Sequence, residues 1–300
     1  MRNHMFRTVA SVTIAAAATV GVLASPASAS NTPPLPDAAL VGTWVNTNAN
    51  TRSVKQIVVE RDRTGGITVD GFGACIPTLC EWGRVPAIVY GPNVSAKTGA
   101  TFQTDQAFLI NKTGEWSRTQ LLATVRVAAT GAKALTVREL TAFEDASGRH
   151  NFTVTETFVP GQGLPATTDG TSASGYPLGF PPSAEAGLAG TWTAPGNAVI
   201  KLEINLVFGS PLIHAFGACS PSACDMGTVK GITYGPTISA TTGNVVLAPF
   251  SFGFKNEQLV IVYVRGTTPA RDRLLVGNYN EFTDGSGRSN YVVNETFFRA

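Results

Sequence analysis

The chain has 300 residues, of which 43% are hydrophobic and 14% are charged, and its formal net charge is +2. This hydrophobic fraction excludes a disordered chain, and the length allows one large domain or two of ordinary size. So small a net charge gives no indication of a protein that binds polyanions.

Residues 1–29 have the composition of a secretory signal peptide. Arg2 and Arg7 precede an uncharged run rich in Ala and Val from Thr8 to Ala24, and Ala27-Ser28-Ala29 supplies small residues at a cleavage site. The run is too short for a membrane-spanning helix. We therefore predict that this segment is removed and that the protein is secreted and extracellular.

Removal of the signal peptide makes the protein electrically neutral. The 22 basic residues fall to 20 because Arg2 and Arg7 are lost, and the acidic residues also number 20. A neutral protein lacks the cationic surface that nucleic acids and anionic membranes attract, so neither is expected as a partner. No second apolar stretch of 18 residues or more is present, so no membrane span is expected.

Two copies of one sequence unit make up most of the remaining chain. Phe72–Pro77 recurs as Phe216–Pro221, and in each copy a second cysteine follows the first after four residues. Tyr90-Gly91-Pro92 recurs as Tyr234-Gly235-Pro236. Both copies open with Gly-Thr-Trp, and the matches keep the same order, which indicates a duplication.

The duplication sets the expected domain boundaries. We predict a first domain over residues 30–160 and a second over residues 188–300, each of ordinary domain size. Residues 161–187 are rich in Gly, Pro, Ser and Thr, which is typical of a linker. The sequence thus predicts two domains on a semi-flexible tether.

Strand signals dominate both copies, and long helical periodicity is absent. Runs rich in β-branched and aromatic residues alternate with short Gly- and Ser-containing turns. Eight such runs per copy predict an all-β fold of two tandem eight-stranded antiparallel up-and-down barrels, with β-sandwiches as the alternative. In the second copy the expected strands are Gly190–Ala194, Val199–Phe208, Leu212–Cys219, Gly227–Thr237, Val245–Phe254, Leu259–Arg265, Leu274–Phe282 and Asn290–Arg299.

The first and last strands of each copy resemble those of the calycins, and among them the avidin-like and lipocalin-like proteins. The first copy opens with Gly42-Thr43-Trp44-Val45-Asn46, and both copies end on a strand that contains Glu-Thr-Phe. The resemblance implies a barrel with a ligand in its lumen and makes Asn46 a candidate contact, since an asparagine at this position contacts biotin in avidin-like proteins. Ala194 replaces Asn46 in the second copy, which argues against biotin there.

The four cysteines predict two disulfides. Outside the cytosol an even number of cysteines at matched spacing favours the pairs Cys75–Cys80 and Cys219–Cys224, each closing the hairpin between the third and fourth strands. The alternative is a metal site that uses the thiolates together with His214. The first copy has no histidine at that position, so no metal is expected.

Catalytic motifs are missing from the sequence. His150 and His214 occupy non-equivalent positions, so the copies share no Ser-His-Asp or Cys-His arrangement, and no phosphate-binding loop is present. We therefore predict that the protein is not an enzyme and needs no cofactor. A carboxylate pair of the glycosidase type stays the alternative, and the shared acids are Glu81/Asp225, Asp145/Asp284 and Glu156/Glu295.

The last strand of each copy carries the candidate ligand-binding residues. Alternation of side chains places each glutamate on the apolar face of its strand, which we expect to point into the barrel. A buried carboxylate needs a partner: either a bound ligand, or a structural pair with Arg149, Arg288 or a tyrosine hydroxyl. The candidate residues are Glu156, Glu295, Phe152, Phe158, Tyr291, Phe297 and, from the resemblance, Asn46.

Two functions are consistent with these patterns. The first is non-catalytic binding of a small apolar or amphipathic ligand in the barrel lumen. The second is surface recognition of an extracellular polysaccharide or protein through paired loops, in the manner of a lectin or an inhibitor, where tandem copies would add avidity.

Overall fold

A computed structural model describes residues 35–109, 116–143, 147–168 and 179–300. The predicted signal peptide lies outside the described residues, as does the central part of the predicted linker. The described residues form strands and two short 3₁₀ turns, η1 (Ala186–Leu188) and η2 (Pro269–Arg271). No helix among them is long and apolar enough to cross a membrane.

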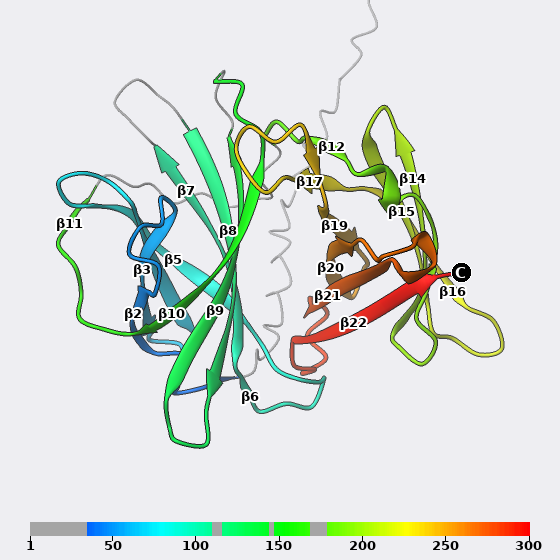
Figure 1. Cartoon of the computed structure of the whole chain (residues 1–300). Coiled ribbons are helices and arrows are strands. Elements are labelled where there is room, and N and C mark those ends of the chain that lie inside the picture. Colours follow the sequence, from blue (N-terminus) through cyan, green and yellow to red (C-terminus); the bar gives the residue numbers. More distant parts are fainter. Residues whose placement is uncertain (1–34, 110–115, 144–146, 169–178) are drawn as a thin grey trace, which may run out of the picture.

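The first repeat is a closed antiparallel barrel (Figure 1). Each strand pairs with the next along the chain, the last returns to the first, and the pairing of β5 with β7 closes the barrel. This confirms the predicted eight-stranded up-and-down barrel. Its strands are β2 (Gly42–Asn46), β3 (Val54–Arg61), β4 (Ile67–Gly73), β5 (Leu79–Tyr90), β7 (Thr101–Leu109), β8 (Trp116–Val127), β9 (Lys133–Phe143) and β10 (Phe152–Pro160).

The second repeat has the same topology and is nearly closed. Its fourth strand is divided at Gly231, where a Cβ atom would lie 2.5 Å from Val246 Cγ1, so the backbone passes too close for a side chain. All eight strands predicted from the sequence are present. They are β13 (Gly190–Thr193), β14 (Val199–Val207), β15 (Ser210–Gly217), β16 with β17 (Cys224–Lys230 and Ile232–Tyr234), β19 (Val245–Ser251), β20 (Lys255–Val264), β21 (Arg273–Phe282) and β22 (Tyr291–Arg299).

A buried tryptophan fills one end of each barrel. Trp44 Nε1 donates to Leu40 O (2.8 Å), and Trp192 Nε1 donates to Leu188 O (3.0 Å). Both rings are almost wholly buried, and each packs in the apolar core of its own repeat. These cores also contain Phe158 and Phe297, so the tryptophan half of each lumen is filled with side chains.

The two barrels pack against each other, contrary to the expected semi-flexible tether. Gly91 N donates to Asn290 O (2.9 Å), and Gly235 N donates to Asn151 O (3.0 Å). These are equivalent residues in exchanged roles, so the repeats are related as in a two-fold symmetric dimer. Strands of both barrels share a third apolar core, which consists of Leu122, Leu140, Ile232, Tyr234, Val245, Leu247 and Val260.

A glutamine cluster lies in the same interface. Gln258 Nε2 donates to Gln120 Oε1 (2.9 Å), and Gln258 Oε1 accepts from Gln120 and Gln103 (3.3 and 3.4 Å). Each described end of the predicted linker forms a short strand that pairs with the repeat next to it. Strand β11 (Ala166–Thr168) pairs with β5, and β12 (Ser183–Ala184) pairs with β18 (Thr242–Gly243).

Candidate functional site

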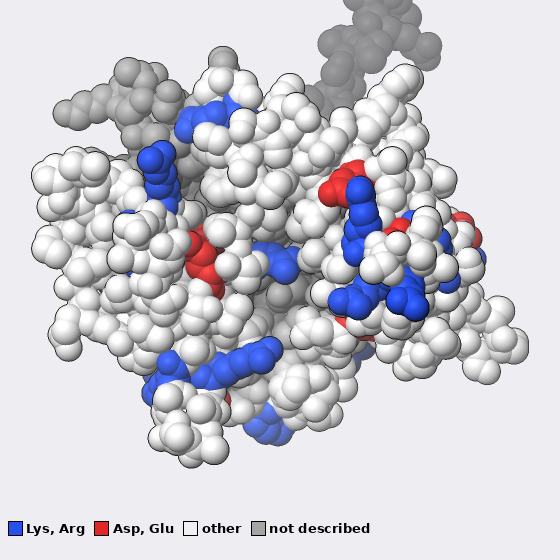
Figure 2. All heavy atoms as spheres, viewed as in Figure 1, with Lys and Arg blue, Asp and Glu red and all other residues white. Residues whose placement is uncertain are grey.

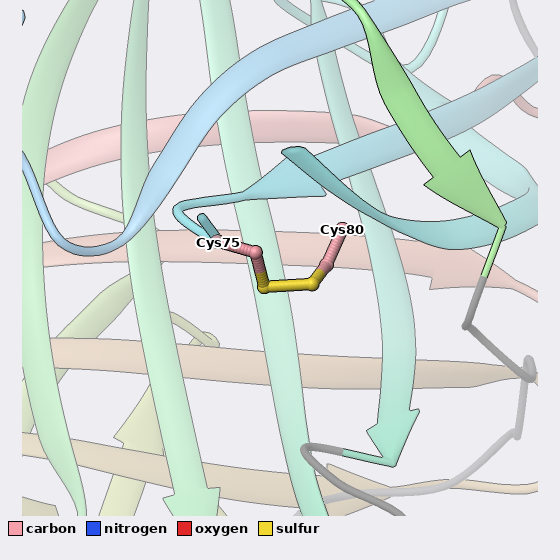
Figure 3. The surroundings of a disulfide bond; sticks show 2 residues. All are labelled: Cys75 and Cys80. Carbon is pink, nitrogen blue, oxygen red and sulfur yellow. A yellow bond between two sulfur atoms is a disulfide. The ribbon is translucent and has the colours of Figure 1, made fainter. Parts of the chain in front are cut away.

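A disulfide shapes the mouth of the first barrel, at the end opposite Trp44. Cys75 and Cys80 are bonded across the β4–β5 turn with their Cα atoms 5.5 Å apart (Figure 3). Cys219 and Cys224 form the equivalent bond, with Cα atoms 5.4 Å apart. Both predicted pairs are confirmed. The described residues contain no group of three or more His, Cys, Asp or Glu residues that could hold a metal ion.

A pocket of about 540 Å³ occupies this mouth and is partly open to solvent. Its wall is mainly apolar and includes Trp82, Phe143, Phe152 and Ile238, and a set of hydroxyl groups adds hydrogen-bonding capacity. The lining residues are Thr51, Arg52, Ser53, Gly73, Ala74, Cys75, Trp82, Ser117, Thr119, Thr141, Phe143, Arg149, Phe152, Val154, Pro236, Thr237 and Ile238.

Trp82 lies against β4, where two glycines make room for its ring. A Cβ atom at Gly73 would lie 2.7 Å from the indole Nε1, and one at Gly71 would lie 3.1 Å from Cε3. Gly73 of the repeated Phe-Gly-Ala-Cys segment, and Gly71 just before that segment, thus have a steric role in this repeat. In the second repeat Met226 replaces Trp82 and Ala215 replaces Gly71.

An arginine that stacks on one ring of an aromatic pair forms one side of the pocket. Arg149 Cζ lies 4.0 Å from the centroid of the Phe143 ring, which stacks on Phe152 with 5.9 Å between ring centroids. The guanidinium is also fixed by a hydrogen bond from Nε to Ser147 Oγ (2.8 Å). The planar cation is therefore held in place where it can bind a polar group of a ligand.

The second repeat completes the pocket with Pro236, Thr237 and Ile238. The turn is held by a hydrogen bond from His150 N to Ile238 O (2.8 Å), while the Ile238 side chain stays 45% exposed. Sequence reasoning missed this contribution because it treated the repeats as independent. An available signal was the apolar residue in an otherwise polar turn, which recurs in the first repeat as Val94.

Two carboxyl groups lie below the polar part of the pocket. Glu139 is fully buried and accepts a short hydrogen bond from Ser53 Oγ, while its Oε1 has no hydrogen-bond partner. Burial, with the nearby carboxylate of Glu156 adding to it, raises the pKa of Glu139 to about 8. Glu156 in turn accepts from Asn46 Nδ2 (2.6 Å).

The equivalent end of the second barrel has different chemistry. Lys255 and Glu257 stand where the first barrel has Ser117 and Thr119, and they form an ion pair (2.5 Å). Phe250 and Phe252 stack at 6.5 Å and pack on the core of this repeat. The duplicated mouths are therefore not equivalent ligand sites.

Among the candidate ligand-binding residues, Phe152 lines the pocket, whereas Phe158 and Phe297 lie in the apolar cores. The proposed pairing of the glutamates with Arg149 or Arg288 is not observed. Arg288 pairs instead with Asp284 (2.6 Å). The arginines emerge from the loop before the last strand and reach back over the aromatic rings.

The remaining candidates form polar contacts near the barrel ends. Glu156 is bound by Asn46, as described above, and Glu295 accepts from Ala198 N (3.1 Å). Burial raises the pKa of Glu295 to about 7. Tyr291 lies beside Phe282, with 6.1 Å between ring centroids; this tilted pair occupies the positions of the stacked pair Phe152 and Phe143 in the first repeat.

No protein-family model matches this chain, and no curated protein matches it. The functional argument therefore rests on the geometry and chemistry of the site.

Proposed function

We propose that the protein is a secreted, non-catalytic binding protein that holds a small apolar or amphipathic ligand in the mouth of its first barrel. The observation that carries the proposal is the apolar pocket of about 540 Å³ behind the Cys75–Cys80 disulfide. This volume lies within the range of pockets that hold single small molecules. The two disulfides are compatible with an oxidising, extracellular environment.

The distribution of groups in the pocket suggests how a ligand would lie. Its apolar part would pack among Trp82, Phe143 and Ile238. Its polar part would meet the hydroxyl groups of Thr119 and Thr141, which already hydrogen-bond each other (2.8 Å), and the Arg149 guanidinium at the edge. A few fixed polar groups in an apolar wall orient a ligand while burial supplies most of the affinity.

The lining residues favour binding over catalysis. The described lining includes Ser53 and Ser117 but no histidine. The carboxyl group beside Ser53 belongs to Glu139, and burial raises its pKa to about 8, so it holds its proton at neutral pH and is a poor base. His214 lies on a different surface, where Nε2 contacts Asp225 (2.7 Å). We therefore retain the prediction that the protein is not an enzyme.

A titration with the neutral dye N-phenyl-1-naphthylamine tests this function. We expect saturable fluorescence enhancement with one dye per chain. Ile238→Asp places a charge at the apolar rim and should weaken binding about tenfold or more, because the charge loses water when the dye binds. No saturable binding, or binding unchanged by this substitution, would contradict the proposal.

Val94→Asp is the matched control. Val94 occupies the equivalent turn, is 42% exposed, and lies at the mouth of the second barrel, where Ser289 N donates to Val94 O (2.9 Å). The same change in charge and exposure is made there without touching the pocket. We expect dye affinity within about twofold of the wild type; equal losses in both variants would indicate a general effect of charge.

A further inference from the structure

A second cavity, of about 490 Å³, lies between the two barrels. Figure 2 shows the surface hollowed between the barrels, with basic side chains inside the hollow. The cavity lies on the pseudo-two-fold axis, because equivalent residues of the two repeats line it from opposite sides. The equivalent pairs are Leu122 with Val260, Thr124 with Val262, Thr136 with Leu275, Arg138 with Gly277, and Thr155 with Asn294.

The two walls of this groove have diverged in polarity. The wall from the first repeat presents Thr124, Thr136 and Arg138. The positions opposite, in the second repeat, are Val262, Leu275 and Gly277. At these positions the duplication has produced a cationic, hydroxyl-bearing side that faces an apolar side, while Tyr279, Asn294, Glu295 and Thr296 add polar groups elsewhere on the second-repeat wall.

Two arginines line this groove: Arg126, which is exposed, and Arg138, which is partly buried and lacks a partner among the described residues. Burial lowers the pKa of the Arg138 guanidinium. Within the described part of the chain it makes no hydrogen bond or ion pair. Tyr279 is the titratable group that acts on its pKa, and burial raises the pKa of Tyr279 itself to about 12. Glu295 also borders the groove, but its carboxyl group is bound by Ala198 N. A buried cation without a hydrogen-bond or ion-pair partner lowers the stability of the folded protein.

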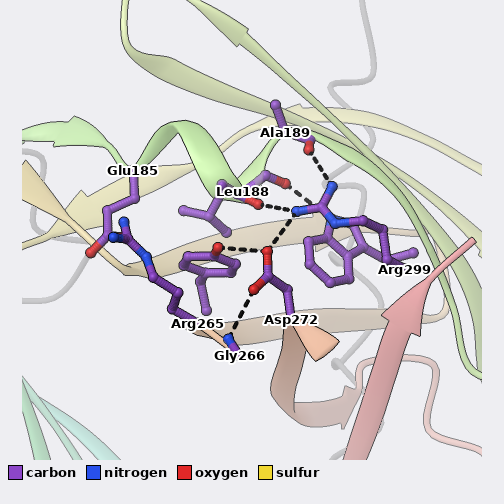
Figure 4. Close-up of polar contacts among 10 residues, drawn as sticks. Glu185, Leu188, Ala189, Arg265, Gly266, Asp272 and Arg299 are labelled. Carbon is purple, nitrogen blue, oxygen red and sulfur yellow. Dashed lines mark hydrogen bonds and ion pairs between the residues drawn. The ribbon is translucent and has the colours of Figure 1, made fainter. Parts of the chain in front are cut away.

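Arg299 shows how the same chain pairs another partly buried arginine. Its guanidinium donates to Gly187 O (2.7 Å), Ala189 O (3.0 Å) and Asp272 Oδ2 (3.2 Å), as Figure 4 shows for the last two. It also stacks on Trp192, with Cζ 4.3 Å from the ring centroid. Arg138 has none of these contacts, and the space beside it is open.

We propose that this groove binds a small amphipathic monoanion, a carboxylate or sulfonate that bears an apolar group. The anionic head would be bound by the Arg138 guanidinium and the hydroxyl groups of Thr124 and Thr136. The apolar group would lie on Val262 and Leu275, the latter 41% exposed. This site is separate from the pocket in the barrel mouth and does not depend on it.

The probe for this site is 8-anilinonaphthalene-1-sulfonate, an apolar ring system with a sulfonate. We expect saturable binding at low ionic strength that weakens with added salt. Arg138→Gln should reduce affinity roughly 10- to 100-fold, the value of hydrogen bonds to a charged group. Arg138→Lys, which keeps the charge, should lose less. Equal binding by wild type and Arg138→Gln would overturn the proposal.

Two further variants locate the bound probe. Arg273 is exposed on β21 and does not line the groove, so Arg273→Gln removes one charge elsewhere and should leave affinity unchanged. Ile238→Asp, which blocks the mouth pocket, should also leave it unchanged. If Ile238→Asp abolishes binding of the sulfonate and Arg138→Gln does not, the probe occupies the mouth pocket and the groove proposal fails. For the neutral dye we expect the reverse: Ile238→Asp should weaken its binding, and Arg138→Gln should leave its binding unchanged.

Discussion

Replacing Glu139 by glutamine should make the stability of the protein less dependent on pH. The carboxyl group is fully buried, and burial raises its pKa from the ordinary 4.5 to about 8. Below pH 4.5 both the folded and the unfolded state hold the proton, and no stability is lost. Between pH 4.5 and 8 the unfolded state releases the proton while the folded state keeps it, so the free energy of unfolding falls as pH rises.

The size of this effect follows from the shift. Each pH unit in that window costs about 1.4 kcal/mol, so a shift from 4.5 to about 8 amounts to about 5 kcal/mol, and the loss levels off above pH 8. Glutamine has nearly the shape of the protonated acid and carries no charge. The second repeat has an amide, Asn278, at the equivalent position, so the fold accommodates this chemistry.

Urea unfolding of the wild type and Glu139→Gln from pH 4 to pH 9 measures the effect. We expect similar stabilities at pH 4 and a more stable variant at pH 9, with the difference growing through the window. Asp70, Asp105 and Glu295 also have raised pKa values, of about 7, 6 and 7, but they are present in both proteins, so the difference isolates Glu139. A difference that stays constant across this range would refute the reasoning.

The remaining predictions concern the disulfides and the interface. Replacing both Cys75 and Cys80 by alanine should lower the free energy of unfolding by about 2 kcal/mol, the loop entropy of a six-residue ring, and should weaken dye binding. The corresponding double replacement in the second repeat should lower stability by a similar amount and leave dye binding unchanged. Chemical denaturation measures the stability of each variant, and dye titration measures its binding. The shared apolar core predicts that both barrels unfold in one transition. Gln258→Ala leaves Gln120 and Gln103 without that partner, so it should lower the free energy of unfolding by about 1–3 kcal/mol. Two separate calorimetric transitions would contradict the rigid interface.

Much of the fold could be predicted because its signals are local in sequence. The alternation of apolar residues in segments such as Val199–Val207 marks a strand directly, and the matched spacing of the cysteines limits their pairing to neighbours. Because the unit is duplicated, the same alternation of apolar residues and the same cysteine spacing appear twice in the sequence. The eight-stranded barrel and both disulfides follow from these features.

The packing of the barrels could not be predicted from the same features. Leu122 and Val260 alternate with luminal residues on strands that are apolar on both faces, and the sequence does not say whether the outer face meets a loop, another domain or a second chain. Because the contact between the barrels could not be predicted, the role of Ile238 in the mouth of the first barrel could not be predicted either. The filling of the lumen by Phe158 likewise depends on volumes that only the closed barrel defines.

The polar contacts of the candidate site depend on pairs that are distant in sequence. Asn46 and Glu156 are 110 residues apart and meet because β2 pairs with β10 when the barrel closes. The sequence identified both residues as candidates but not their contact with each other. The sequence does not indicate Glu139 as a candidate, because its partner Ser53 lies in a loop with no recognisable motif.

A crystal structure of the protein grown with N-phenyl-1-naphthylamine tests the central claim most directly. We predict one dye molecule in the mouth of the first barrel, with its rings among Trp82, Phe143 and Ile238, and no dye at the equivalent end of the second barrel, where Lys255 and Glu257 are paired. A dye bound elsewhere, or a mouth pocket that stays empty while the dye is bound in solution, would contradict the account.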